Sequence, residues 1–119
     1  MRIRWLLLAL ALSALLLSLH LWGTAEFLYW KFVWFDSPMH LLGGITLGVF
    51  VAAFLNAPQP AKFYALIIVL IVGWEVFEFF LGSPRKENYG FDTALDLFLG
   101  LLGASLAYYS ARRSLWRSE

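Results

Sequence analysis

The sequence predicts an all-α fold: a polytopic membrane protein that forms a bundle of four transmembrane helices in one domain, residues 1–119. Two features of composition favour a membrane. The 119 residues are 61% hydrophobic and 14% charged, whereas soluble domains average about 45–50% and about 25%. A soluble domain this small has too little interior to bury so much apolar surface. The third observation is four apolar runs, each close to the about 20 residues that a helix needs to cross the hydrocarbon core.

Prolines and aromatic residues divide the chain between these runs. The spans are expected at about residues 5–22, 39–55, 62–81 and 91–109. The second span follows Pro38 and the third ends before Pro84, as expected because proline interrupts helices. Residues 26–36 are rich in aromatic side chains, which favour the headgroup region of a bilayer. This segment is predicted to be a short interfacial helix between the first two spans.

The first run has two interpretations. Arg2 and Arg4 followed by apolar residues also occur in cleavable signal peptides, but the run of about 18 residues exceeds their usual 7–15. We therefore expect it to be retained as the first span, and a signal peptide is the alternative.

Lysines and arginines predict the orientation. One side of the four-span topology carries Arg2, Arg4, Lys62, Arg112, Arg113 and Arg117, and the other carries Lys31, Arg85 and Lys86. Because cytoplasmic loops carry the excess of basic residues, both termini are expected in the cytoplasm, with the protein in the inner (plasma) membrane.

Five carboxylates lie inside or at the edges of the spans: Asp36, Glu75, Glu78, Asp92 and Asp96. Ionisable residues in a bilayer cost several kcal/mol and indicate function by default. With the expected topology, these residues and His40 lie within about 10 Å of the extracytoplasmic interface, at 1.5 Å of rise per residue. They recur at three- or four-residue spacings, so neighbouring members share a helix face.

Glycines accompany this acidic layer at helical spacing: Gly43, Gly44, Gly48, Gly100 and Gly103. Small residues let membrane helices approach closely, so the acidic faces are expected to point into the bundle. Two acids also have a structural interpretation. Asp36 could be a helix N-cap before Pro38, and Asp92 could compensate the helix dipole. Glu75, Glu78 and Asp96 lie too deep in their spans for either role.

So many carboxylates in one layer require protons or a bound cation. Carboxylates and histidine, in a chain with no cysteine, suit Mg, Mn, Ca or Zn, so a divalent metal is the candidate cofactor. The expected metal ligands are His40, Glu75, Glu78, Asp92 and Asp96, with Asp36 as an additional one. Glu75 or Glu78 would be the catalytic general base, and Arg85 and Lys86 would bind an anionic headgroup.

Three motifs in order carry a family resemblance. They are Asp36-x-x-x-His40-x-x-Gly43-Gly44, Trp74-Glu75-x-x-Glu78, and Asp92-Thr93-x-x-Asp96-x-x-x-Gly100-x-x-Gly103-Ala104. This arrangement resembles small inner-membrane proteins of the YjdF type and, more distantly, the VanZ-like family. VanZ-like proteins are linked to glycopeptide resistance. The resemblance implies a membrane bundle and no particular reaction.

Three functional classes remain open. The cluster could support metal-dependent chemistry on a lipid or headgroup substrate. It could be the proton or cation site of a channel, transporter or sensor, which would need a homo-oligomer because four helices enclose little pore. It could also belong to an accessory structural subunit. Enzymatic activity is undecided, and no basic patch indicates nucleic-acid binding.

Overall fold

The computed structural model describes residues 2–32, 34–81 and 89–116, and every regular element in these ranges is a helix. The helices are α1 (Arg2–Ala25), α2 (Leu28–Lys31), α3 (Asp36–Phe54), α4 (Pro60–Leu81) and α5 (Tyr89–Arg113). All except α2 contain a stretch long and apolar enough to cross a membrane. The predicted all-α membrane protein with four candidate spans is confirmed.

The predicted short helix between the first two spans is present as α2, but it is shorter than the predicted segment 26–36. No other described residue between α1 and α3 is helical, and Phe27 before α2 has a φ of 57°. Helix α3 then begins at Asp36, three residues before the predicted start at Met39. Pro38 does not delay this start because the first N–H groups of a helix have no intrahelical partner to lose. The span therefore includes an acidic residue in its first turn.

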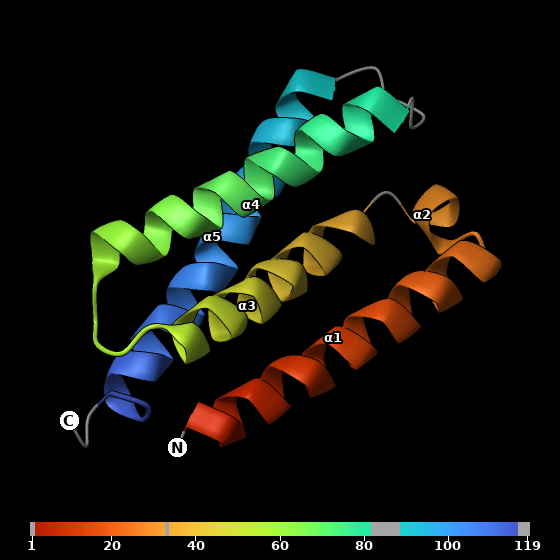
Figure 1. The fold of residues 1–119 in the computed structure, drawn as a ribbon. Coiled ribbons are helices and arrows are strands. Elements are labelled where there is room, and N and C mark those ends of the chain that lie inside the picture. Colours follow the sequence, from red (N-terminus) through yellow and green to blue (C-terminus); the bar gives the residue numbers. More distant parts are fainter. Residues whose placement is uncertain (1, 33, 82–88, 117–119) are drawn as a thin grey trace.

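Helix α3 lies at the centre of the bundle (Figure 1). Helix α1 packs along one side of α3 and runs antiparallel to it, and α5 packs along another side and runs parallel to it. Both described ends of the chain lie at the same end of the bundle (Figure 1). This agrees with four membrane crossings.

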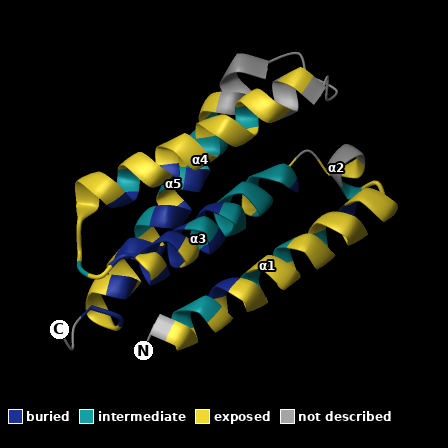
Figure 2. Cartoon of the chain, in the orientation of Figure 1, coloured by how far each residue is buried: buried dark blue, intermediate teal, exposed yellow. Residues whose placement is uncertain are grey.

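Helix α1 contacts α3 through one narrow seam. Apart from Leu6, its buried or half-buried residues recur at alternating spacings of four and three, at Trp5, Ala9, Leu12, Leu16, Leu19 and Gly23. This is the heptad spacing of helices that pack almost side by side. The rest of α1 is largely exposed (Figure 2), and in a bilayer these leucines would contact lipid.

Helices α3 and α5 approach each other at backbone contact. A Cβ atom added to Gly44 would overlap the backbone of Gly100, and one added to Gly103 would overlap the backbone of Leu41. The predicted packing glycine Gly43 differs, because a Cβ there would meet only Leu16 of α1, at 3.9 Å. The contact between α3 and α5 therefore depends on residues without side chains.

Helix α4 packs mainly through its first half. Phe63 and Ile67 are fully buried, and the hydroxyl groups of Tyr64 and Ser105 lie 2.7 Å apart. Ser105 Oγ donates to the carbonyl of Leu101, so the Tyr64 hydroxyl is the donor toward Ser105. Most of the remaining surface of α4 is exposed (Figure 2). Among the described residues, the buried side chains of Phe63 and Ile67 and this hydrogen bond hold α4 in the bundle.

We expect Tyr64→Phe to lower the free energy of unfolding by about 0.6 kcal/mol and at most about 1.7, the range measured for hydrogen bonds between membrane helices. The measurement is a double-mutant cycle with Ser105→Ala in detergent. The double variant should lose less than the sum of the single variants. Additive losses would show that the two hydroxyl groups do not interact.

Candidate functional site

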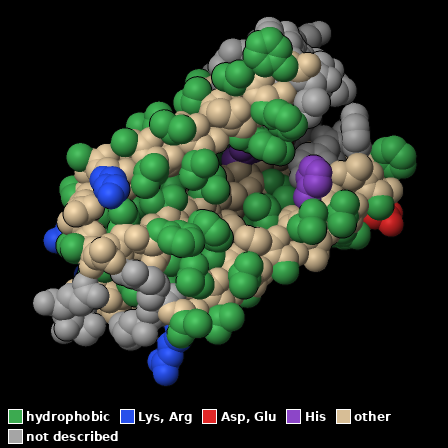
Figure 3. All heavy atoms as spheres, viewed as in Figure 1, with side chains coloured by type: hydrophobic (Ala, Val, Ile, Leu, Met, Phe, Trp, Pro, Cys, Tyr) green, Lys and Arg blue, Asp and Glu red, His purple; other side chains and the backbone are tan. Residues whose placement is uncertain are grey.

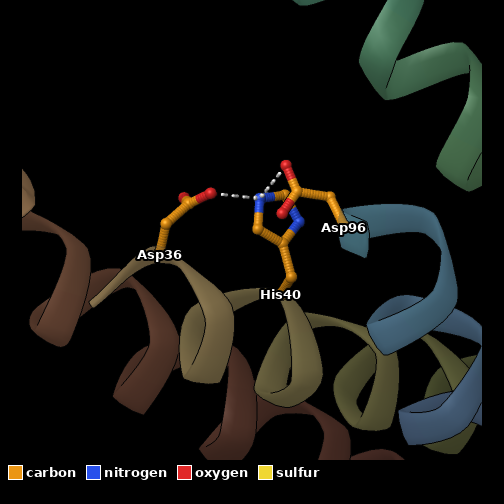
Figure 4. Close-up of side chains that lie close together, drawn as sticks. All are labelled: Asp36, His40 and Asp96. Atoms are coloured by element: carbon orange, nitrogen blue, oxygen red, sulfur yellow. Dashed lines mark ion pairs between the residues drawn. The ribbon is translucent and has the colours of Figure 1, made fainter. Parts of the chain in front are cut away.

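Three predicted site residues converge at the end of the bundle opposite the described chain ends. Asp36 and His40 lie one turn apart on α3, and Asp96 lies on α5. His40 Nε2 is 3.3 Å from Asp36 Oδ2 and 3.2 Å from Asp96 Oδ2. The two carboxylates approach the imidazole from different sides (Figure 4). One ligand atom from each residue lies within 4.8 Å of the other two.

The helix contact that brings these residues together is the glycine contact between α3 and α5. Gly44 meets Gly100 and Gly48 meets Ala104, and both pairs are 56 residues apart in the chain. His40 and Asp96 have the same separation. They therefore continue the same pair of helix faces by one turn. At this level side chains replace glycines, and an imidazole and a carboxylate fill the space between the backbones.

The cluster is half-buried. The exposed fractions of the side chains are 32% for Asp36, 22% for His40 and 15% for Asp96. Asp96 is the most enclosed of the three. The single N–H on Nε2 cannot donate a full hydrogen bond to both carboxylates. The arrangement therefore suits a shared proton or a cation bound between the oxygens and the nitrogen.

Glu75 approaches this cluster from α4 without entering it. The pairs Tyr64–Ser105 and Ile71–Gly100 set the antiparallel register of α4 and α5, and this register places Glu75 level with Asp96. The side chain is half-buried. Glu75 is not one of the three residues whose ligand atoms converge. Three helices thus bring acidic side chains to one layer.

The structural interpretation of Asp36 as an N-cap is wrong. Phe35 occupies the cap position of α3 with no side-chain cap hydrogen bond, and Asp36 is the first residue of the helix. Its carboxylate is instead paired with His40, one turn further along. Sequence spacing alone does not decide between an N-cap and a partner of His40, because an acid at the start of a helix is compatible with both roles.

Four other predicted residues lie outside what the structure describes. They are Arg85 and Lys86, as whole residues, and Glu78 and Asp92, as side chains. The helical backbone at both acids is described, and the registers that place Asp96 opposite His40 and Glu75 also bring these two positions to the same end of the bundle.

His20 is a titratable residue of α1 that is not among the predicted site residues. It lies on α1, five residues before that helix ends, at the same end of the bundle as Asp36. A histidine inside an apolar span is itself a signal of function. The acids are more numerous and recur at helical spacing, so the sequence pattern points to them and not to His20.

Comparisons with known proteins give one match. The family model described as "Predicted membrane protein (DUF2238)" matches residues 1–117. No curated protein and no solved structure matches the chain. The match therefore covers nearly the whole bundle, including all the residues of the cluster.

Proposed function

The chain belongs to the predicted membrane protein family DUF2238, and from this premise we propose that it binds a divalent cation between α3 and α5. The ligands are Asp36, His40 and Asp96. The observation that carries the proposal is the convergence of their three ligand atoms within 4.8 Å of one another. Two oxygens and one imidazole nitrogen form a donor set that suits a hard or borderline divalent ion.

The site lies near the extracytoplasmic face of the inner (plasma) membrane in this proposal. Exposed basic side chains support this orientation at the opposite end of the bundle, where Arg4, Lys62, Arg112 and Arg113 lie close to the described chain ends. The positive-inside rule favours that end for the cytoplasm. Asp36, Asp96 and Glu75 would then lie in the outer leaflet, within reach of lipid headgroups.

The reaction class that best fits this location is metal-dependent chemistry on a lipid or headgroup substrate. Glu75 is supported as general base because the register of α4 and α5 places it level with Asp96, outside the three convergent ligands. Glu78 and Asp92 would add further carboxylates, and Arg85 and Lys86 would bind an anionic headgroup. We also infer that the chain is of the YjdF type and more distantly VanZ-like, from the three motifs that include these acids.

A proton or cation pathway is the second candidate, and one observation favours it. His40 Nε2 lies at nearly equal distances from two carboxylates, which is the geometry of a shared proton. This function would require a homo-oligomer to enclose a pore. An accessory subunit whose acids only join the helices is the third candidate, and it binds no ion.

Elemental analysis of the protein purified in mild detergent tests the first candidate. We expect one divalent ion per chain, with affinity at least about tenfold weaker in Asp36→Asn and Asp96→Asn, the lower end of the losses seen at metal sites. Glu26→Gln is the matched control because Glu26 is an exposed acid in the turn after α1 and should have no effect.

Other outcomes separate the remaining candidates. Ion flux across liposomes that responds to pH, without a bound metal, would favour the pathway. Variants that bind nothing and differ from wild type only in melting temperature would favour the accessory subunit.

A further inference from the structure

One face of α5 carries exposed, largely apolar side chains that lead to an arginine. Phe98, Leu102, Leu106 and Tyr109 are exposed, and Arg113 follows Tyr109 after one turn. At 3.6 residues per turn, these five positions fall within about 80° of the helix surface. The first four cover about 16 Å at 1.5 Å per residue, which is about half of the ~30 Å hydrocarbon core. This apolar stripe, Phe98 to Tyr109, therefore matches one leaflet and ends beside a cation.

The Arg113 side chain is held against Tyr109. Arg113 Nη2 donates a hydrogen bond to Tyr109 Oη at 3.0 Å, and the guanidinium carbon lies 4.8 Å from the centroid of the Tyr109 ring. Because Tyr109 is one turn closer to the middle of α5, both contacts hold the guanidinium back toward the apolar stripe. Tyrosine favours the headgroup region of a bilayer, and the guanidinium N–H groups that do not bond to Tyr109 can donate to a phosphate. Arg113 is thus placed at the level of a phospholipid headgroup.

Basic side chains gather at this end of the bundle without acids beside them. Arg4, Lys62 and Arg112 are also exposed here, and the space-filling view shows Lys and Arg side chains at this end and an acidic side chain at the other (Figure 3). The carboxylate side chains that the structure describes all belong to the opposite end: Glu26, Asp36, Glu75 and Asp96. Within the described part of the chain, an anionic partner therefore meets positive charge with no competing acid.

We propose that this face of α5 binds an anionic phospholipid, with an acyl chain along the apolar stripe and the phosphate at Arg112 and Arg113. Anionic headgroups are favoured over zwitterionic ones because each Lys or Arg near a charged membrane surface strengthens the attraction about fivefold. The two arginines could instead serve only the helix, since basic residues in a last turn compensate its dipole. That role requires neither a lipid nor the contact with Tyr109. The lipid site is independent of the cation site, which lies at the other end of the bundle.

Lipid-dependent quenching of a fluorophore beside Arg113 tests the proposal. The chain has no cysteine, so Ser114→Cys, at an exposed position, can be labelled alone. The labelled protein is placed in phosphatidylcholine liposomes that contain a small fraction of nitroxide-labelled phosphatidylglycerol or, separately, of nitroxide-labelled phosphatidylcholine. We expect quenching that corresponds to an enrichment of phosphatidylglycerol of at least about fivefold next to the label.

Three substitutions in the labelled protein locate the site. Arg113→Gln should lower the enrichment about fivefold. Tyr109→Leu keeps every charge and should lower it about two- to fivefold, the value of an exposed cation–π contact, whereas compensation of the helix dipole alone predicts no change. Lys31→Gln is the matched control, because Lys31 is an exposed basic residue at the opposite end of the bundle, and it should leave the enrichment unchanged.

Several outcomes would overturn the lipid site. Equal quenching by the two lipids without these substitutions would contradict it. An enrichment that Tyr109→Leu leaves unchanged, or that Lys31→Gln lowers as much as Arg113→Gln does, would also contradict it. If inorganic phosphate removes the enrichment while sodium chloride of the same ionic strength does not, the arginines bind free phosphate and the assignment to a lipid is wrong. None of these results concerns metal binding, so the lipid site and the proposed function fail separately.

Discussion

Replacing Gly44 by leucine should separate α3 from α5 and eliminate the cation site. A Cβ atom at this position would already overlap the backbone of Gly100. The overlap cannot be relieved by rotating a flexible side chain, so the two helices must move apart. Overpacking of a core typically costs about 1–3 kcal/mol, and we expect at least the upper end of this range here. The free energy of unfolding in detergent, followed by tryptophan fluorescence, measures the effect.

Gly73 provides the matched control on α4. A Cβ at Gly73 would meet nothing within 4 Å, so Gly73→Leu should fold like wild type or gain up to about 1 kcal/mol, because glycine is a poor helix former. Gly44→Ala should fall between Gly44→Leu and wild type. A Gly44→Leu protein with wild-type stability and wild-type metal binding would show that close approach of the two helices is not required.

The connection between Gly44 and the site is geometric. His40 and Asp96 extend the same helix faces that meet at Gly44 and Gly100. Any substitution that moves α5 outward therefore lengthens the distance from Asp96 to His40, although it touches neither residue. The clearest evidence for this coupling would be a Gly44→Ala protein in which the free energy of metal binding falls by more than the free energy of unfolding.

The helices could be predicted because hydropathy and proline placement decide them with little help from tertiary structure. The four runs near residues 5–22, 39–55, 62–81 and 91–109 correspond to helices that are a few residues longer at most of their ends. The main differences are at the interfacial segment, where α2 covers only four of the described residues, and at Asp36, which starts α3. Helix ends depend on turns and caps, which a hydropathy pattern does not contain.

The sequence indicates the depth in the bundle at which these residues lie, but it does not indicate which of their side chains touch. Depth follows from position within a span, so the sequence places Asp36, His40, Glu75 and Asp96 at one level, and the structure brings Asp36, His40 and Asp96 together. Which side chains touch depends on how each helix is rotated and how far it stands from its neighbours. Glycines at backbone contact bring His40 to Asp96, while Glu75 lies at the same level on α4 and is not among the three residues whose ligand atoms converge.

His40→Ala should abolish metal binding and destabilise the metal-free protein. Both Asp36 Oδ2 and Asp96 Oδ2 lie near the same imidazole nitrogen, so its removal leaves two carboxylates without the group between them. Removing one partner of a fully buried ion pair costs about 3–5 kcal/mol. The pairs here are partly exposed, and we expect about 2–3 kcal/mol in unfolding experiments, with metal affinity reduced at least about 100-fold.

A second substitution separates the loss of a ligand from the repulsion between acids. Adding Asp96→Asn to His40→Ala removes one of the two facing carboxylates, so stability should recover toward wild type because like charges no longer meet in a poorly solvated layer. Metal binding should not recover, because two of the three donors are gone. If the double variant regains stability but does not regain metal binding, the cluster serves to bind the ion and does not serve to stabilise the fold. A double variant less stable than His40→Ala would instead show that Asp96 joins the helices, and wild-type affinity in His40→Ala would remove the imidazole from the site.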